Sequence, residues 1–142
     1  RIEGARCLDL FAGSGALGLE AASRGAAEVV LVEVNKGTAR ALQDLAASLA
    51  PARITVYPGS AERFLASGVA PFDLVFLDPP FASDLLPTVA RALEAHKLLA
   101  PEARIYLEYG PPDPWPALPS KWCCLRSGKA GEVSYALASS CH

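Results

Sequence analysis

Two short stretches of the sequence contain residue types that could do chemistry. The first is Asp78-Pro79-Pro80-Phe81, at the end of the apolar run Phe72–Asp78. Its two prolines hold the backbone and remove two N–H donors, which leaves carbonyl groups as acceptors. The Asp78 carboxylate and the Pro79 carbonyl can each accept a hydrogen bond from one exocyclic amino group, and Phe81 can stack on the ring that carries it. This pattern favours methylation of such an amine, because two acceptors stabilise the positive charge that develops on nitrogen.

The second stretch is a glycine-rich loop near the start of the chain. Gly13, Gly15 and Gly18 match the G-x-G-x-x-G dinucleotide fingerprint, and Glu33 follows Gly13 by twenty positions, close to where that fingerprint places an acidic residue. However, the carboxylate of Asp9 precedes these glycines. It would be unfavourable beside a pyrophosphate at a helix N-terminus and favourable beside the ammonium and sulfonium groups of S-adenosylmethionine. Asp9 therefore favours S-adenosylmethionine over NAD as the ligand of the loop.

Further residues extend this expected cofactor site. Glu33 ends the run "LVEVN", where its carboxylate can accept hydrogen bonds from both ribose hydroxyls of an adenosine. Ser60 and Ala61 follow the next apolar run, where the adenine edge is expected. The predicted cofactor-binding residues are Asp9, Phe11, Gly13, Gly15, Glu33, Ser60 and Ala61, and the predicted catalytic residues are Asp78, Pro79, Pro80 and Phe81. No metal site is predicted, since the two histidines are isolated in the sequence.

Strand-like apolar runs alternate with stretches of helical period along most of the chain. Strands are expected at residues 7–11, 28–33, 53–57, 72–78 and 104–109, and helices at 15–24, at 36–48, from Ser60, and from 83 or 84 to 95. This alternation predicts an α/β fold, with a parallel, doubly wound sheet and helices on both faces. A proline-rich loop at 110–119 then leads to two strand-like runs, 121–126 and 132–138. We expect these two to form a terminal antiparallel hairpin with "SGKAG" as its turn.

Length and composition limit the class of protein. The 142 residues, 51% of them hydrophobic and 20% charged, are typical of one globular domain, so residues 1–142 are expected to form a single methyltransferase domain. The apolar runs are strand-length and far shorter than a membrane helix, which predicts a cytoplasmic protein without a membrane partner. The formal net charge of −2 gives no support for a nucleic-acid-binding surface, although it leaves room for a local basic patch.

With these stretches assembled, the chain resembles the class I S-adenosylmethionine-dependent amino-methyltransferases. It is most similar to the bacterial family that methylates guanine N2 in 16S ribosomal RNA. The stretches that carry the resemblance are "DLFAGSGALGLEAASRGA", "LVEVN", "FDLVFLDPPF" and "GKAGEVSYAL". The resemblance implies a Rossmann-like sheet of seven strands with the last strand antiparallel. It also implies cofactor contacts at Asp9, Gly13, Gly15 and Glu33, and substrate-amine contacts at Asp78, Pro79 and Phe81.

The resemblance also implies a partner, namely 16S rRNA in the small ribosomal subunit or an assembly intermediate, bound by a monomer. Members of the family usually have a further N-terminal segment, which we expect this chain to lack. Lys121, Arg126 and Lys129 are candidates for contacts with RNA phosphates, with a solvated hairpin as the other interpretation.

Three alternatives stay open at this point. The amine could belong to adenine N6 or to a glutamine side chain of a protein, although an Asn commonly opens the tetrapeptide in such enzymes. The glycines alone would fit an NAD-dependent oxidoreductase, but that hypothesis gives no role to Asp9 or to Asp78–Phe81. A non-catalytic binding module with the same fold is the third.

Overall fold

The computed structural model describes residues 2–49, 52–79, 85–110 and 118–140. In chain order the elements are β1 (Arg6–Asp9), α1 (Ala16–Ser23), β2 (Glu28–Glu33), α2 (Lys36–Leu49), β3 (Ile54–Pro58), α3 (Ala61–Leu65), β4 (Phe72–Leu77), α4 (Leu85–Ala95), β5 (Leu99–Tyr109), β6 (Trp122–Ala130) and β7 (Val133–Ser140).

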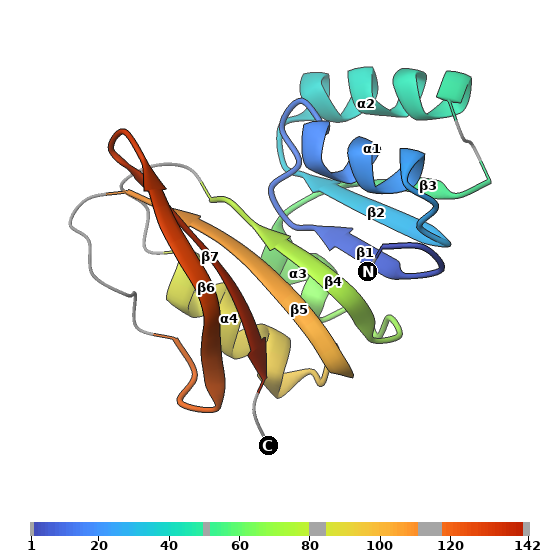
Figure 1. Ribbon diagram of the computed structural model, residues 1–142. Coiled ribbons are helices and arrows are strands. Elements are labelled where there is room, and N and C mark those ends of the chain that lie inside the picture. The colour runs from blue at the N-terminus through green and yellow to red at the C-terminus, as the bar shows by residue number, and fades with distance from the viewer. Residues whose placement is uncertain (1, 50–51, 80–84, 111–117, 141–142) are drawn as a thin grey trace.

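In the described part of the chain, seven strands form one sheet in the order β3-β2-β1-β4-β5-β7-β6 (Figure 1). Strands β1 to β5 pair in parallel, whereas β7 pairs antiparallel with both β5 and β6. The order reverses at β1, and ligands of doubly wound sheets bind beyond the carboxyl ends of the strands at such a point. The predicted fold class, with its terminal antiparallel hairpin, is confirmed.

The terminal hairpin differs in detail from the sequence prediction. Strand β6 continues to Ala130, which pairs with Val133, so the turn consists of Gly131 and Glu132 and not of residues 127–131. Gly131 has a φ of 62°, a backbone conformation that glycine adopts at little cost. Residues 127–130, which were expected in the turn, instead belong to the ladder, where Gly128 pairs with Tyr135. The predicted position of the turn was wrong because pairing with β7 outweighs the low strand propensity of glycine and serine.

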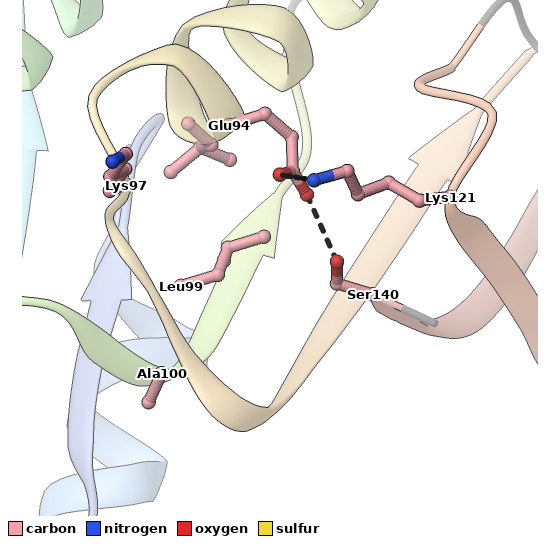
Figure 2. A pocket seen from close by; sticks show the side chains of 7 residues that line it. Glu94, Lys97, Leu99, Ala100, Lys121 and Ser140 are labelled. Carbon is pink, nitrogen blue, oxygen red and sulfur yellow. Dashed lines mark hydrogen bonds and ion pairs between the residues drawn. The ribbon is translucent and has the colours of Figure 1, made fainter. Parts of the chain in front are cut away.

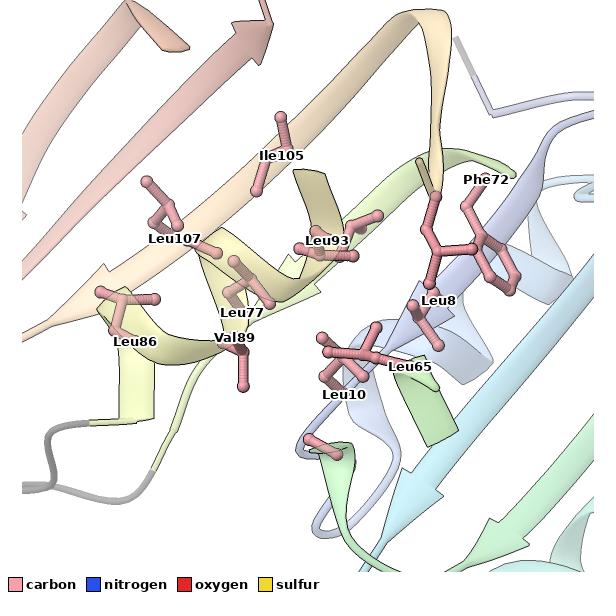
Figure 3. Packing of buried hydrophobic residues seen from close by; sticks show 14 of the residues in the cluster. Leu8, Leu10, Leu65, Phe72, Leu77, Leu86, Val89, Leu93, Ile105 and Leu107 are labelled. Atoms are coloured by element: carbon pink, nitrogen blue, oxygen red, sulfur yellow. The ribbon is translucent and has the colours of Figure 1, made fainter. Parts of the chain in front are cut away.

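Helices cover the sheet on both faces. Against one face, α3 and α4 pack a core that includes Leu65 of α3, Leu93 of α4 and Leu107 of β5, all almost inaccessible to solvent (Figure 3). On the other face, α1 and α2 contribute smaller side chains, among them Ala21 and Leu42. The two layers fix the strand ends, and with them the loops that follow.

Helix α1 lies very close to β2 because of Gly18. A Cβ atom at this position would lie 2.2 Å from Leu31 Cδ2 and 3.2 Å from Val29 Cγ1, both side chains of β2. The third glycine of the fingerprint therefore serves helix–strand packing. No helix among the described residues is both long and apolar enough to cross a bilayer.

Candidate active site

Three acidic residues meet at the carboxyl edge of the sheet. Asp9 is the last residue of β1, Glu33 is the last residue of β2, and Asp78 directly follows β4. Strand β1 lies between the other two strands, and Asp9 pairs with Leu31 of β2 and with Phe76 of β4. The topology thus brings together three of the predicted site residues that are far apart in the sequence.

The glycine loop joins β1 to α1 with two residues at positive φ. Gly13 has a φ of 54° and Gly15 a φ of 82°. A Cβ at Gly13 would meet no atom within 4 Å, so open space lies above this part of the loop. At Gly15 the same atom would lie 2.6 Å from Leu42 Cδ2, which shows that Gly15 lets the loop pack closely on α2. Gly13 is therefore the position where the backbone is open to an approaching ligand.

The Glu33 carboxylate ties this loop to the end of β2. The Gly13 N–H donates to Glu33 Oε1 at 2.8 Å, and the Asn35 N–H donates to Oε2 at 2.9 Å. Each carboxylate oxygen has a further acceptor position, so Glu33 can bind the backbone and still accept from a hydroxyl. The fingerprint predicted that Glu33 and Gly13 lie near each other, but it gave no sign of this backbone role.

Asp9 is a buried carboxylate, with a side chain that is 2% exposed. The Phe11 N–H donates to its Oδ1 at 3.3 Å. Burial raises the pKa of Asp9 to about 7, and the negative charges of Asp78 and Glu33 add to the rise, while hydrogen bonds from the Phe11 and Gly18 backbone oppose it. None of the ion pairs formed among the described residues includes Asp9. A cation held beside Asp9 would stabilise its charged form.

The other predicted cofactor-binding residues, Phe11, Ser60 and Ala61, make less specific contacts. Phe11 is partly buried and packs against the core cluster on the α3 and α4 face. Ser60 caps α3, because its Oγ accepts a hydrogen bond from the Arg63 N–H at 3.1 Å. Ala61 is buried in the core beneath. The turn that carries these two residues is held at the end of β2, where the Gly59 N–H donates to the Glu33 carbonyl at 3.0 Å.

Asp78 and Pro79 follow β4, with Asp78 exposed and Pro79 half-buried. Pro80 and Phe81 lie outside the described residues. Partial burial raises the pKa of Asp78, and the negative charge of Glu108 raises it further. Glu108, near the end of β5, was not predicted as a site residue. Its place depends on the register in which Leu107 pairs with Leu77, which the sequence does not signal.

A cavity lies at the opposite edge of the sheet from these acidic residues. Figure 2 shows this cavity of about 240 Å³, lined by Leu93, Glu94, Lys97, Leu99, Ala100, Lys121 and Ser140. Its acidic group is already engaged: Glu94 accepts hydrogen bonds from Trp122 Nε1–H at 2.5 Å and from the Ser140 hydroxyl at 3.2 Å, and it pairs with Lys121 Nζ at 3.6 Å. These contacts join α4 to the terminal hairpin, so we assign this cluster a structural role.

Solved structures define the class of protein. A solved Escherichia coli structure, described as that of a methyltransferase, superposes with a TM-score of 0.94 at 40% identity, over 99% of this chain and 80% of that chain. A ribosomal protein L11 methylase from Lactobacillus delbrueckii subsp. bulgaricus has a TM-score of 0.80 at 20% identity, over 99% of this chain and 72% of that one, which is a likeness of fold. The fold is that of the Rossmann-like methyltransferases.

Sequence comparisons identify the family within this class. A family model described as "Conserved hypothetical protein 95" matches residues 1–139. The "Ribosomal RNA small subunit methyltransferase D" of Escherichia coli strain K12 is 42% identical over 133 residues, which are 94% of this chain and 67% of that protein. The protein of the same name from Haemophilus influenzae is 38% identical over 141 residues, 96% of this chain and 72% of that protein. The chain belongs to this family, and the predicted resemblance is confirmed.

A shorter part of the chain is similar to an enzyme named for a different substrate, a tRNA. The "tRNA1(Val) (adenine(37)-N6)-methyltransferase" of Escherichia fergusonii is 33% identical over 79 residues, or 54% of this chain and 32% of that protein.

Proposed function

We propose that the protein transfers the methyl group of S-adenosylmethionine to the exocyclic N2 amine of a guanine in small-subunit (16S) ribosomal RNA. The observation that carries the proposal is the position of the Asp78-Pro79 acceptors, which follow β4 directly beside the glycine loop of β1. The names of the Escherichia coli and Haemophilus influenzae relatives support ribosomal RNA as the substrate class.

The residues at the carboxyl edge fit S-adenosylmethionine better than a dinucleotide. Asp9 is a buried carboxylate that none of the described ion pairs neutralises, and the cofactor has an ammonium and a sulfonium but no phosphate. Open space above Gly13 leaves room for the bound molecule, and the two Glu33 oxygens retain acceptor positions for the ribose hydroxyls. Ser60 and Ala61 would border the adenine. The cofactor supplies an electrophilic methyl group when bound.

The chain's own residues then orient and polarise the substrate amine. The Asp78 carboxylate and the Pro79 carbonyl accept one hydrogen bond each from the two N–H groups of the amine, and Phe81 stacks on the base. These bonds hold the nitrogen lone pair toward the methyl group. They also strengthen as positive charge develops on nitrogen, so they stabilise the transition state more than the ground state. The proton leaves after transfer, so no base with a lowered pKa is required.

The biological setting belongs to the same proposal. We infer a cytoplasmic, monomeric enzyme, in which residues 1–142 form one methyltransferase domain, acting on 16S rRNA in the small subunit or an assembly intermediate. Arg126 and Lys129 are exposed on β6 and are proposed to contact RNA phosphates. Lys121 forms an ion pair with Glu94.

Substitution of Asp78 tests the proposal. Asp78→Ala should lower turnover on 16S rRNA by roughly 10²-fold or more, the usual effect of losing a polar contact made in the transition state. Affinity for S-adenosylhomocysteine, measured by calorimetry, should stay within about twofold, because Asp78 lies on the substrate side of the site. Asp44→Ala, an exposed carboxylate on α2, is the matched control and should change neither quantity. Normal turnover in Asp78→Ala would refute the role of Asp78.

Adenine N6 is the second candidate, and the match to the Escherichia fergusonii enzyme is the observation that favours it. That match covers about half of the chain, whereas the matches to the ribosomal RNA enzymes cover nearly all of it. Mapping of the methylated base separates the two candidates.

A further inference from the structure

Glu108 lies beside Asp78 on the neighbouring strand. Leu77 of β4 pairs with Leu107 of β5 in parallel register; Asp78 directly follows β4, and Glu108 is the next residue of β5. Adjacent strands lie about 4.8 Å apart, and paired residues point to the same face. The electrostatic coupling agrees with this placement, since the charge of Glu108 raises the pKa of Asp78.

A tyrosine on the same strand fixes the Glu108 carboxylate. The Tyr106 hydroxyl donates to Glu108 Oε2 at 2.8 Å, and residues two apart on a strand share a face. The Tyr106 ring is held in turn by an edge contact with Phe76 of β4, with ring centroids 6.3 Å apart. No residue in the described part of the chain donates a hydrogen bond to the other oxygen, Oε1. Glu108 thus offers one oriented acceptor next to the acceptors proposed for the amine.

We propose that Glu108 is a specificity-determining residue, which accepts a hydrogen bond from N1–H of the target guanine while Asp78 and Pro79 hold its N2 amine. This inference rests on the proposed guanine-N2 function and deepens it. In guanine, N1–H and the N2 amine are adjacent donors on the Watson–Crick edge, so they match adjacent acceptors on two neighbouring strands. Adenine has a lone pair on N1, which would face the carboxylate without a hydrogen bond. Glu108 would therefore select the base, and Tyr106 would be its positioning residue.

The base analogue 2-aminopurine isolates this contact. It keeps an exocyclic amine at C2, but its N1 is an acceptor. The test compares kcat/KM on two small-subunit rRNA substrates, identical except for guanine or 2-aminopurine at the mapped target position. We expect the wild-type protein to prefer guanine by roughly 10- to 100-fold, the discrimination of one well-placed polar base contact.

Substitution of Glu108 should abolish this preference. In Glu108→Gln the side-chain amide can donate to N1 of 2-aminopurine, so the ratio of the two kcat/KM values should fall to about one or below. Tyr106→Phe should lower the ratio part of the way, because Glu108 loses the donor that orients it. Glu102→Gln changes an exposed glutamate on the same strand and should keep the wild-type ratio.

The possible outcomes distinguish a failure of this inference from a failure of the proposed guanine-N2 methylation. A wild-type ratio in Glu108→Gln overturns the role of Glu108 and leaves guanine methylation intact. Failure of the wild-type protein to methylate any guanine N2 overturns the proposed function itself. If Glu108→Gln turns over neither substrate, the ratio of Kd values for the two RNAs in the presence of S-adenosylhomocysteine gives the same comparison: equal values support the inference, and the wild-type preference contradicts it.

Discussion

Asp9 is buried although burial of a charged carboxylate is costly. Its pKa is raised because water is excluded and because Asp78 and Glu33 add negative charge. The folded protein therefore stabilises the protonated form of Asp9 more than the unfolded chain does. A charged residue that opposes folding in this way is typical of a binding site whose ligand carries the opposite charge. At the scale of single residues, the site is therefore assembled at a cost in stability.

Asp9→Asn should make the cofactor-free protein more stable at pH 8. The folded-state pKa of Asp9 is about 7 against an ordinary value of 3.8, so the wild-type protein loses stability as pH rises between about 4 and 7. The asparagine variant lacks this loss. The gain in the free energy of unfolding should reach up to about 4 kcal/mol at pH 8 and shrink toward pH 5. Urea unfolding at both pH values measures it, and a pH-independent difference would contradict this account of Asp9.

Residue-scale roles were predictable from sequence only in part. Gly13 and Glu33 were found because a fingerprint fixes their spacing, and Asp9 was found because a carboxylate before these glycines suits a cationic ligand. The structure brings all three together. The backbone contacts of Glu33 and the place of Glu108 were not found. The first depends on loop conformation, and the second depends on the register between β4 and β5, neither of which leaves a periodic signal in the sequence.

At the scale of elements, the close packing of α1 on β2 positions the glycine loop. Gly18 allows the helix to lie against Leu31 and Val29, and the loop enters the helix three residues earlier, at Gly15. The order and type of the elements followed from hydrophobic periodicity. The turn of the terminal hairpin did not, because strand pairing with β7 decided the conformation of Ser127 and Gly128.

Gly18→Ala should destabilise the protein by about 1–3 kcal/mol, since the new Cβ would overlap a buried Leu31 side chain. Affinity for S-adenosylhomocysteine should also fall, because α1 must shift away from β2 and move the loop with it. Gly37→Ala on α2 is the control: its Cβ would have only an ordinary contact, 3.5 Å from Asn35 Oδ1, and alanine favours the helix. Chemical unfolding and calorimetry measure both variants, and equal stability of the two would contradict the packing role of Gly18.

At the scale of the whole molecule, one edge of the sheet carries the candidate site and the opposite edge carries structural contacts. The carboxyl edge gathers Asp9, Glu33, Asp78 and Glu108, whereas the amino edge of β5 is joined to the hairpin through Glu94. Sequence predicted the doubly wound sheet and its acidic site. It did not predict the contact between Glu94 and Trp122, which joins residues 28 positions apart through side chains alone.

Trp122→Phe should therefore lower stability without changing the cofactor site. The substitution removes the Nε1–H donor of a buried side chain and leaves a half-buried Glu94 with one hydrogen bond fewer, which costs about 1–2 kcal/mol. Affinity for S-adenosylhomocysteine should stay unchanged, because the hairpin is tethered at the opposite edge. A loss of affinity in a variant that is still folded would contradict the separation of the two edges.

The central claim is methyl transfer to guanine N2 of small-subunit rRNA, and mapping of the transferred label tests it most directly. The protein is incubated with S-adenosylmethionine labelled in its methyl group and with 16S rRNA, free or in small subunits, and the RNA is digested to nucleosides. The account predicts label in N2-methylguanosine alone, reduced roughly 10²-fold in Asp78→Ala. Label in N6-methyladenosine, or no transfer to any RNA form, would contradict it.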